Sequence, residues 1–542
     1  MMLQALEYLG VISPKPVTPS TPHTATVVAH PVVTDLTVRI FSPPDSPSTC
    51  ELDPRIWHRI EKDLHLYASH QSAWLYVALA NEEKLAPEDL VVVDIRVGEP
   101  PPNTSPDCAW ESRHGGIWVR RRSKSSCKID QAVTGMDVLF GIDAVDPRPQ
   151  WALMQSPLQL NTRQDVPVAR LSVLHGRAKP RSDTRPTLRV RADGTFKIVQ
   201  ISDTHMVTGV GVCKDAIDAD GRNLPESEAD PLTVDFIGKV LDAERPDLVV
   251  FTGDQLHHGI RDSQSALFKV VAPVIERSIP FAAVFGNHDS EGDHALSRTA
   301  QMSILQNLPF SLCEPGLEQV DGIGNFYLQV LAPAPSRLAL ATLYLLDSHG
   351  EIPSRVFSSG YDHIKQSQIE WFLKASQAQR SAREKNNDLS IAFLHIPLPE
   401  FKDRRLVVRG GRRREPTEGP SCNSHFYDAL VKERISALGC GHDHVNDFCA
   451  LLPQEYGDNP PLAGPWLCYG GGSGFGGYCS YGKSRFHRRT RTWQFDTNAR
   501  SLKTWKRVEY ASDRVDELVL VKGGAVVNDL GEEGDGRSCA VS

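Results

Sequence analysis

Five short polar motifs, each at the end of an apolar run, carry the residues whose types and spacing suit chemistry. Their side chains offer carboxylate and amide oxygens and imidazole nitrogens, which are ligands that Fe, Zn and Mn accept. In chain order the motifs are Asp203-Thr204-His205, Gly253-Asp254, Gly286-Asn287-His288-Asp289, His395 and Gly441-His442-Asp443-His444. Two metal ions a few ångströms apart can activate water and clamp a phosphoryl group. The motifs therefore predict a two-metal centre, and the lack of cysteine among them argues against a closed structural zinc site.

A single member of this set carries little weight by itself. One histidine or aspartate after a strand is usually a turn or cap residue, and Gly-Asp and Gly-Asn-His-Asp are also plain turn sequences. The whole set is different, because independent turns have no reason to place aspartate, asparagine and histidine after five successive strands. We therefore interpret the motifs together, as one site.

The segments that precede the motifs predict the elements that must position them. Near-continuous apolar runs indicate strands that are buried on both faces, and apolar residues three and four apart indicate helices between them. Strands that alternate with helices predict an α/β layered domain, whose strand ends deliver side chains to one rim. The expected strands span residues 196–201, 248–251, 281–285, 338–346, 391–394 and 435–438, and the expected helices span 233–241, 263–277 and 366–375.

Composition divides the chain into five parts. Residues 1–30 predict a flexible N-terminus, because residues 14–30 are rich in Pro, Thr and Ser. Short strand-like runs between turns predict a smaller β-rich domain at 31–175, and a polar, Pro-broken linker follows at 176–189. The α/β domain is expected at 190–510, with a C-terminal tail at 511–542 that is disordered at its end. Similar runs around Asp94 and Asp137 are either an internal repeat of a sheet unit or ordinary unrelated strands.

Charge, hydropathy and cysteine content limit the class of protein. The 542 residues carry a formal net charge of −8, so we expect no nucleic-acid partner, which would favour a basic face. No apolar run approaches the roughly 18–20 residues that a transmembrane helix needs, and the N-terminus makes a poor signal peptide. The 11 cysteines are scattered, which favours reduced thiols. These features fit a cytosolic or nuclear protein, and we expect it to be cytoplasmic.

The order Asp-x-His, Gly-Asp, Gly-Asn-His-Asp, His, Gly-His-x-His resembles the calcineurin-like metallophosphoesterase superfamily over residues 190–510. The resemblance implies a four-layer α/β/β/α sandwich. It also implies that His288 lies beside the leaving group, that Asp289 orients it, and that no organic cofactor is needed. The ligands that it implies for one metal ion are Asp203, His205, Asp254 and His444, and those for the other are Asp254, Asn287, His395 and His442.

Longer motifs resemble a narrower group, the fungal dosage-dependent cell-cycle regulator phosphatases, which are related to purple acid phosphatases and to plant inactive-type homologues. These motifs are His395-Ile-Pro-Leu-Pro-Glu, Cys440-Gly-His-Asp-His-Val-Asn-Asp and Tyr469-Gly-Gly-Gly-Ser-Gly-Phe-Gly-Gly-Tyr. Purple enzymes carry a Tyr three residues after the Gly-Asp aspartate, where this chain has His257, and they lack a counterpart of His205. The resemblance therefore implies a colourless centre, with Fe, Zn or Mn as the open choices of metal.

The resemblance implies hydrolysis of phosphomonoesters, in which a hydroxide that bridges the metals attacks phosphorus and His288 protonates or stabilises the leaving oxygen. The expected substrate is a phosphorylated protein or a small phosphoester, with a serine/threonine phosphoprotein phosphatase as the leading class. A phosphodiesterase acting on nucleotides or phospholipid head groups would use the same ligands. A third alternative is a metal-bearing non-catalytic scaffold, whose N-terminal domain binds a protein partner.

Three further segments have two interpretations each. The arginines at 404, 405, 409 and 412–414 could grip phosphate, but a solvated loop is favoured. The glycines from Gly470 to Gly477 could cradle phosphate, but no Lys-Ser/Thr follows them, so a tight turn at the rim is favoured. His257 and His258 are expected to line the pocket rather than to bind metal.

Overall fold

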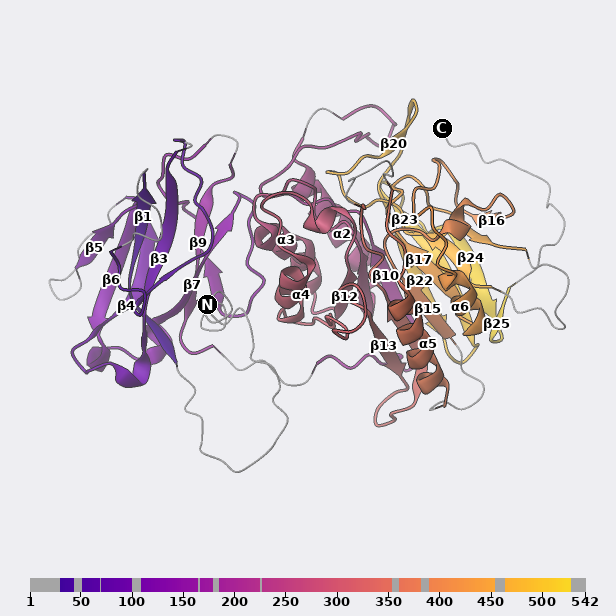
Figure 1. Ribbon diagram of the computed structural model, residues 1–542, viewed down its shortest axis with the longest axis horizontal. Helices are drawn as coiled ribbons and strands as arrows, with labels where there is room; N and C mark the ends of the chain where they lie inside the picture. Colours follow the sequence, from indigo (N-terminus) through magenta and orange to yellow (C-terminus); the bar gives the residue numbers. More distant parts are fainter. Residues whose placement is uncertain are drawn as a thin grey trace.

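The computed structural model describes residues 30–42, 51–68, 70–99, 109–163, 166–178, 185–224, 227–352, 360–381, 389–453 and 464–527. Residues 1–29 of the expected flexible N-terminus, 179–184 of the expected linker and 528–542 of the expected tail lie outside the described residues. A β-rich N-terminal domain lies beside a larger α/β domain (Figure 1). None of the helices in these described ranges combines the length and apolar character that crossing a membrane requires.

The N-terminal domain contains three sheets of three strands, and each sheet has the same strand order: first, third, second. The first strand of each sheet carries an aspartate, namely Asp35, Asp94 and Asp137, and has a shift in its pairing register. The shift ends at Asp35 and at Asp94 in the first two sheets and lies earlier, before Gly135, in the third. This regularity favours an internal repeat over unrelated strands. The strands are β1 (Pro31–Phe41), β2 (Trp57–Arg59), β3 (Ser72–Asn81), β4 (Leu90–Val97), β5 (Trp110–Arg113), β6 (Ile117–Ser123), β7 (Val133–Phe140), β8 (Trp151–Leu153) and β9 (Ala169–His175).

The α/β domain is built on two seven-stranded sheets. The first has the order β12-β11-β10-β22-β23-β24-β25 and the second has the order β13-β14-β15-β17-β19-β18-β16. The first sheet comprises β10 (Thr195–Ile201), β11 (Leu248–Thr252), β12 (Phe281–Val284), β22 (Arg489–Asp496), β23 (Ser501–Val508), β24 (Val515–Lys522) and β25 (Ala525–Val526). The second comprises β13 (Phe326–Leu331), β14 (Ala339–Leu345), β15 (Leu389–Phe393), β16 (Val407–Gly410), β17 (Ala437–Cys440), β18 (Cys449–Leu451) and β19 (Trp466–Tyr469).

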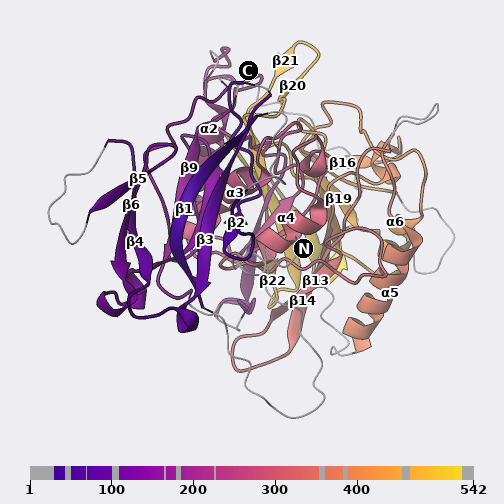
Figure 2. The same cartoon turned by 60° about the vertical axis from the view of Figure 1, so that its left-hand side comes forward.

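Three apolar cores separate four layers. One core, which includes Ile198 and Ile391, lies between the two sheets. A second joins the first sheet to α2 (Ala229–Glu244), α3 (Ser263–Glu276) and α4 (Arg298–Gln306), and a third joins the second sheet to α5 (Gln366–Ser381) and α6 (Phe426–Lys432). Helix α3 faces the N-terminal domain, whereas α5 and α6 lie on the opposite side (Figures 1 and 2). The expected α/β/β/α sandwich with a preceding β-rich region is confirmed.

Parallel strands at the centre of each sheet explain why the motifs meet. Strands β10, β11 and β12 are parallel in the first sheet, and β14, β15, β17 and β19 are parallel in the second. Every residue of β11 and β15 is buried, as the near-continuous apolar runs predict. The carboxyl ends of these strands therefore open on one rim, where both sheets contribute loops.

The α/β domain extends beyond the expected boundary at residue 510. Strand β24 pairs antiparallel with β23, and Leu520 and Val521 are buried in the core between the sheets. The prediction of a tail from residue 511 is therefore wrong for the first part of that segment. Polar and apolar residues alternate only weakly in β24, so the sequence gives little sign of a strand there.

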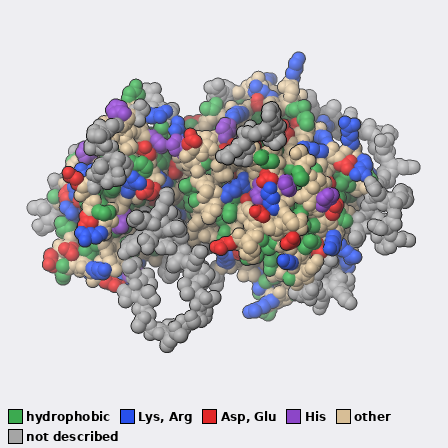
Figure 3. Space-filling model, viewed as in Figure 1, with side chains coloured by type: hydrophobic (Ala, Val, Ile, Leu, Met, Phe, Trp, Pro, Cys, Tyr) green, Lys and Arg blue, Asp and Glu red, His purple; other side chains and the backbone are tan. Residues whose placement is uncertain are grey.

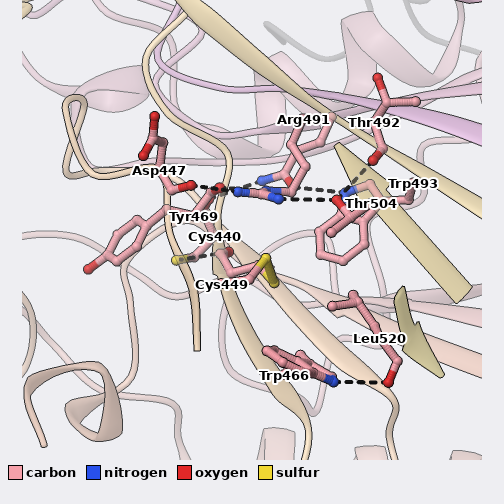
Figure 4. The surroundings of a disulfide bond; sticks show 12 residues. Cys440, Asp447, Cys449, Trp466, Tyr469, Arg491, Thr492, Trp493, Thr504 and Leu520 are labelled. Atoms are coloured by element: carbon pink, nitrogen blue, oxygen red, sulfur yellow. Dashed lines mark hydrogen bonds between the residues drawn. A yellow bond between two sulfur atoms is a disulfide. The ribbon is translucent and has the colours of Figure 1, made fainter. Parts of the chain in front are cut away.

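A disulfide corrects the expectation that the thiols are reduced. Cys449 of β18 and Cys468 of β19 are bonded, and the two residues lie directly opposite each other on neighbouring antiparallel strands (Figure 4). Sequence spacing could not reveal this pair, because adjacency of β18 and β19 depends on the sheet topology. The bond ties the strand after the Gly441–His444 motif to the strand before the glycine-rich segment.

The N-terminal domain is anchored close to the motif loops. The backbone N–H of Phe140 donates to Ser265 Oγ at the start of α3 over 2.8 Å. Lys269 Nζ, which is buried, contacts Asp143 of the N-terminal domain at 2.7 Å and Asp230 at 2.5 Å. Asp230 also accepts from the backbone N–H of Val207, at 3.0 Å. The junction between the domains therefore supports the loop that follows His205.

Candidate metal centre

The seven residues expected to bind metal lie together at the rim. Two groups of ligand atoms each lie within 4.8 Å of one another, and both groups contain Asp254. Asn287 adjoins the second group, with Oδ1 3.2 Å from His395 Nε2. The first group is Asp203, His205, Asp254 and His444, and the second is Asp254, His395 and His442.

The backbone adopts left-handed conformations at the ligands themselves. The φ angles are 55° at Asp203, 45° at His205, 50° at Asp254 and 78° at His442. Each such conformation costs roughly 1–3 kcal/mol and persists only where the surroundings impose it. Strain at four of the ligands indicates that the loops are shaped for the position of their side chains.

The backbone at Gly441 and His442 has two special features. His442 itself carries the positive φ, whereas Gly441 does not. Gly441 is needed for space, because a Cβ there would lie 1.8 Å from Ser202 Oγ and 2.9 Å from Asp203 Oδ2. The glycine therefore lets the second sheet bring its histidines against the Asp203 loop.

The glycine-rich segment from Gly470 to Gly477 packs beneath the ligands. The N–H of Gly472 donates to the His444 carbonyl at 2.8 Å, and the N–H of Gly474 donates to the Asp203 carbonyl at 3.1 Å. A Cβ at Gly477 would lie 2.6 Å from the ring of His444 and 2.7 Å from that of His205. These contacts match the expected tight turn at the rim.

Hydrogen bonds outside the centre orient two of the imidazoles. His395 Nδ1 lies 2.8 Å from the Thr252 carbonyl, and His444 Nδ1 lies 2.8 Å from the Tyr478 carbonyl. A carbonyl accepts only, so each Nδ1 carries a proton and each Nε2 faces the centre. The Nε2 atoms of His205 and His444 are only 3.0 Å apart.

Several buried polar atoms at this centre lack protein partners. Asp203 Oδ2 and His442 Nε2 are buried and accept no hydrogen bond within the described part of the chain. Burial lowers the pKa of His205 and His442 well below the ordinary value and that of His444 to about 3. Neutral imidazoles and an unpartnered carboxylate oxygen are what Zn, Mn or Fe ions bind, so the residues fit such ions.

Without a cation, the two carboxylates respond differently to burial. Burial raises the pKa of Asp203 to about 7. Burial also opposes ionisation of Asp254, but the charge of His395 holds the pKa of Asp254 well below its usual range. Despite its own burial, the pKa of His395 rises to about 9 because of Asp254, which lies 3.2 Å away. Without a bound cation, protonated His395 thus supplies the positive charge beside Asp254.

The structure corrects the expected role of Asp289. Both its carboxylate oxygens accept backbone N–H groups, from Asp254 at 3.1 Å, Leu256 at 2.9 Å and Gly286 at 2.7 Å, so Asp289 braces the loops instead of orienting His288. Glu291 Oε2 lies 2.5 Å from His288 Nδ1. Burial opposes protonation of His288, but the Glu291 contact raises the pKa of His288 above its ordinary value.

A cavity of about 290 Å³ lies over the ligands. His257 and His258 line it, as expected, and neither belongs to the two ligand groups. Sequence reasoning missed Lys214, Tyr361, Glu418 and Tyr478, which also line it. Tyr478 stacks on His444 with ring centroids 4.0 Å apart, and Tyr361 meets the His442 ring edge-on at 4.5 Å. The sequence could have indicated Glu291 as the partner of His288, because it follows His288 by three residues across one short helical turn.

The clustered arginines do not line this cavity. Arg414 Nη1 pairs with Asp447 at 2.6 Å, whereas Arg404, Arg409 and Arg412 are exposed. The favoured interpretation of a solvated loop fits this position. On the face drawn in Figure 3, basic and acidic side chains are interspersed over both domains, in keeping with the net charge of −8.

Comparison with known proteins identifies the family. Residues 196–446 match the family model described as calcineurin-like phosphoesterase. The plant protein named probable inactive purple acid phosphatase 29, from Arabidopsis thaliana, is 35% identical over 357 residues, which cover 61% of this chain and 86% of that one. The chain belongs to the calcineurin-like phosphoesterase family. The family resemblance predicted from the five motifs is thus confirmed.

Phosphatase DCR2 of Saccharomyces cerevisiae is also similar to this calcineurin-like phosphoesterase. It is 35% identical over 392 residues, which cover 69% of this chain but 64% of the yeast protein, so the match spans less than two thirds of that relative. A solved dimetal phosphatase from Danio rerio aligns with 60% of this chain and 99% of its own at 14% identity and a TM-score of 0.38. The family assignment does not depend on that likeness.

Proposed function

We propose that this protein is a metal-dependent phosphomonoesterase that binds two metal ions at the rim, and that its substrates are phosphoproteins modified on serine or threonine. The observation that carries the proposal is the pair of buried, unpartnered ligand atoms, Asp203 Oδ2 and His442 Nε2, within two ligand groups that share Asp254. The name of the yeast relative, a phosphatase, supports the hydrolysis of phosphomonoesters.

In this proposal Asp203, His205 and His444 hold one ion, His395, His442 and Asn287 hold the other, and Asp254 serves both. Bound metal ions supply Lewis acidity to the phosphoryl oxygens and lower the pKa of water. The neutral state of His205, His442 and His444 prepares them as ligands. The Thr252 and Tyr478 carbonyls hold the Nδ1–H groups of His395 and His444, so that Nε2 of each ring faces the centre.

His288 provides the proton in this proposal. Its backbone N–H donates to Asp254 Oδ1 at 2.9 Å, which fixes the residue beside the shared ligand. Glu291 holds Nδ1 and raises the pKa of the ring, so Nε2 can carry a proton to a leaving oxygen near neutral pH. The leaving group would depart on the side of the cavity that His288 and His258 line.

Hydrolysis assays with p-nitrophenyl phosphate and with its bis-ester test this proposal, each with Mn²⁺, Zn²⁺ or Fe²⁺ added to chelator-treated protein. We expect turnover of the monoester to exceed that of the diester, and phosphoserine and phosphothreonine peptides to be hydrolysed. Faster turnover of the bis-ester would instead support a phosphodiesterase. Metal binding without hydrolysis of any substrate would support a non-catalytic scaffold.

A His288→Ala variant provides the control for the role of that residue. It should retain its metal content, because His288 is outside both ligand groups. Its rate should fall by about 10²–10⁴-fold, the usual contribution of a general acid, and most strongly for alkyl phosphates, whose leaving groups need a proton. An equal loss for alkyl and nitrophenyl esters would contradict the assignment.

A further inference from the structure

The lining of the cavity over the metal centre carries charges of both signs. Lys214 and three imidazoles, from His257, His258 and His288, line it together with Tyr361, Glu418 and Tyr478. Among the residues that line the cavity, Lys214 is the single Lys or Arg. An anionic substituent on a substrate therefore has one lysine to bind.

Hydrogen bonds fix the position of the lysine. The ring of His257 donates from Nδ1 to the His258 carbonyl at 2.7 Å, so its Nε2 is an acceptor, and Lys214 Nζ donates to that atom over 3.0 Å. The His257 ring lies 5.8 Å from the ring of the ligand His205. One imidazole thus separates the ammonium group from the metal ligands.

The same residues connect the lysine to the proton donor. The His257 and His258 rings are 4.0 Å apart, and the His258 and His288 rings are 5.4 Å apart. Lys214 is exposed, and within the part of the chain that the structure describes no carboxylate forms an ion pair with it. An ammonium group that is held in place but not neutralised retains its capacity to bind an anion.

Aromatic and acidic side chains also line the cavity. Tyr478 donates its hydroxyl to the carboxylate of Glu415 at 3.1 Å while its ring stacks on His444. The backbone N–H of Glu418 donates to Asp443 at 3.1 Å, and Glu418 is part of the lining. Negative charge on a substrate would be repelled by Glu418.

We propose that Lys214 is a specificity-determining residue that binds a second anionic group on the leaving-group side, so that phosphomonoesters carrying a neighbouring carboxylate or phosphate are preferred. This inference rests on the proposed phosphomonoesterase function. In a phosphoprotein, the anion would be an acidic side chain or a second phosphorylated residue close to the scissile phosphate.

A matched pair of substrates tests the preference. 4-Carboxyphenyl phosphate and 4-carbamoylphenyl phosphate have the same size and differ in the charge of the leaving group. With the Mn²⁺-loaded full-length protein, Lys214→Met should lower kcat/KM for the carboxylate by about tenfold, the effect of one charge-assisted contact. The same variant should leave kcat/KM for the carboxamide within about twofold of the wild type, and Lys214→Arg should restore the preference.

Lys239→Met is the matched control variant, because Lys239 is an exposed lysine of α2 that pairs with Asp235. It should change kcat/KM for neither substrate. If Lys214→Met lowers both rates equally, the specificity role is overturned while the proposed hydrolysis stands.

Calorimetric titration separates this inference from the proposed function, because it needs no turnover. Pyrophosphate should bind the Mn²⁺-loaded protein more tightly than orthophosphate, and Lys214→Met should remove about a factor of ten from that difference. A response to pyrophosphate but not to the carboxylate would assign the subsite to a second phosphate, and the reverse would assign it to an acidic side chain. An unchanged ratio in the titration together with an unchanged substrate preference would overturn the proposal.

Discussion

Buried carboxylates have opposite surroundings in two parts of the molecule, the rim and the cluster around Asp447. At the rim, Asp203 and Asp254 share their space with imidazoles, and Asp203 Oδ2 has no partner in the described chain. Asp447, just beyond His444, is 1% exposed and contacts Arg414 at 2.6 Å, Arg489 at 2.7 Å and Lys506 at 2.7 Å. Figure 4 shows Asp447 beside Arg491, whose guanidinium donates to the Asp447 carbonyl.

The contrast separates a functional from a structural use of buried charge. Fixed cations satisfy Asp447, so the charge of Arg489 and its neighbours holds the pKa of Asp447 far below its usual range although burial opposes this. At the rim, burial keeps the imidazoles of His205, His442 and His444 neutral, so only the protonated His395 is cationic, and burial raises the pKa of Asp203 to about 7. A buried carboxylate without a fixed cation is costly, so a mobile cation must complete the rim.

Asp254→Asn should have the largest effect, because Asp254 belongs to both ligand groups. We expect phosphatase activity to fall by more than about 10³-fold and both metal ions to bind weakly. Added Mn²⁺ should raise the unfolding temperature of the wild type but not that of the variant, each compared with its own chelator-treated form. Mass spectrometry of bound metal and thermal unfolding measure these effects. Near-normal activity would refute the shared-ligand scheme.

Asp447→Asn should show the opposite profile. Removing one partner from a buried ion cluster typically costs about 3–5 kcal/mol. Here it leaves Arg489 without its carboxylate and Lys506 with Asp516 alone. The loss in unfolding free energy, measured in urea, should be the same with and without Mn²⁺. Asp220→Asn is the matched control, since its pair with Arg222 is exposed and should be worth at most about 1 kcal/mol. A loss that depends on metal would erase the distinction between the clusters.

The sequence predicts the rim better than it predicts the Asp447 cluster. Each rim ligand follows a local signal, an apolar run that ends in a polar motif, and parallel strands bring such ends together. The partners of Asp447 come from a loop and from β22 and β23, so no local pattern links Arg414, Arg489 and Lys506 to it. The disulfide and β24 were missed for the same reason: both depend on which strands are neighbours.

Within the rim, the sequence predicts ligand types but misassigns their supports. Asp289 directly follows His288, yet the short helical turn at His288–Ser290 directs the two side chains apart. Lys214 reaches the cavity through backbone geometry that residue spacing does not determine. Positions that depend on φ, such as the left-handed His442, also have no signature in residue type.

The pH dependence of stability should distinguish the two clusters in metal-free protein. Asp203 has a folded pKa raised from 3.8 to about 7, so the folded state binds more protons and stability should fall as pH rises from about 4 to about 7. Asp447 has a depressed folded pKa, so its contribution should be lost as pH falls below about 4. Urea unfolding at pH 3, 5 and 7 with chelator measures both trends.

Added Mn²⁺ should remove the loss of stability between pH 4 and pH 7, because a bound cation favours the charged form of Asp203. It should leave unchanged the loss of stability below about pH 4, which arises from Asp447. The Asp203→Asn variant should lack the loss of stability between about pH 4 and pH 7 even without metal. If the wild type keeps that loss between about pH 4 and pH 7 with Mn²⁺ present, no bound cation compensates Asp203. If the loss is absent from the metal-free wild type, the rim carboxylate is compensated from within the chain, as Asp447 is.

Glu291→Gln should have the smallest effect, because its pair with His288 is more exposed than either buried cluster. The side chains of His288 and Glu291 are 29% and 32% exposed, so loss of the pair should cost at most about 1 kcal/mol of stability, and metal content should be unchanged. Since Glu291 raises the pKa of His288, the variant should move the alkaline limb of the pH–rate profile to lower pH. The rate near neutral pH should fall by about tenfold, more for alkyl than for nitrophenyl phosphates. A rate loss that is uniform across pH and leaving group would show that Glu291 only supports the loop.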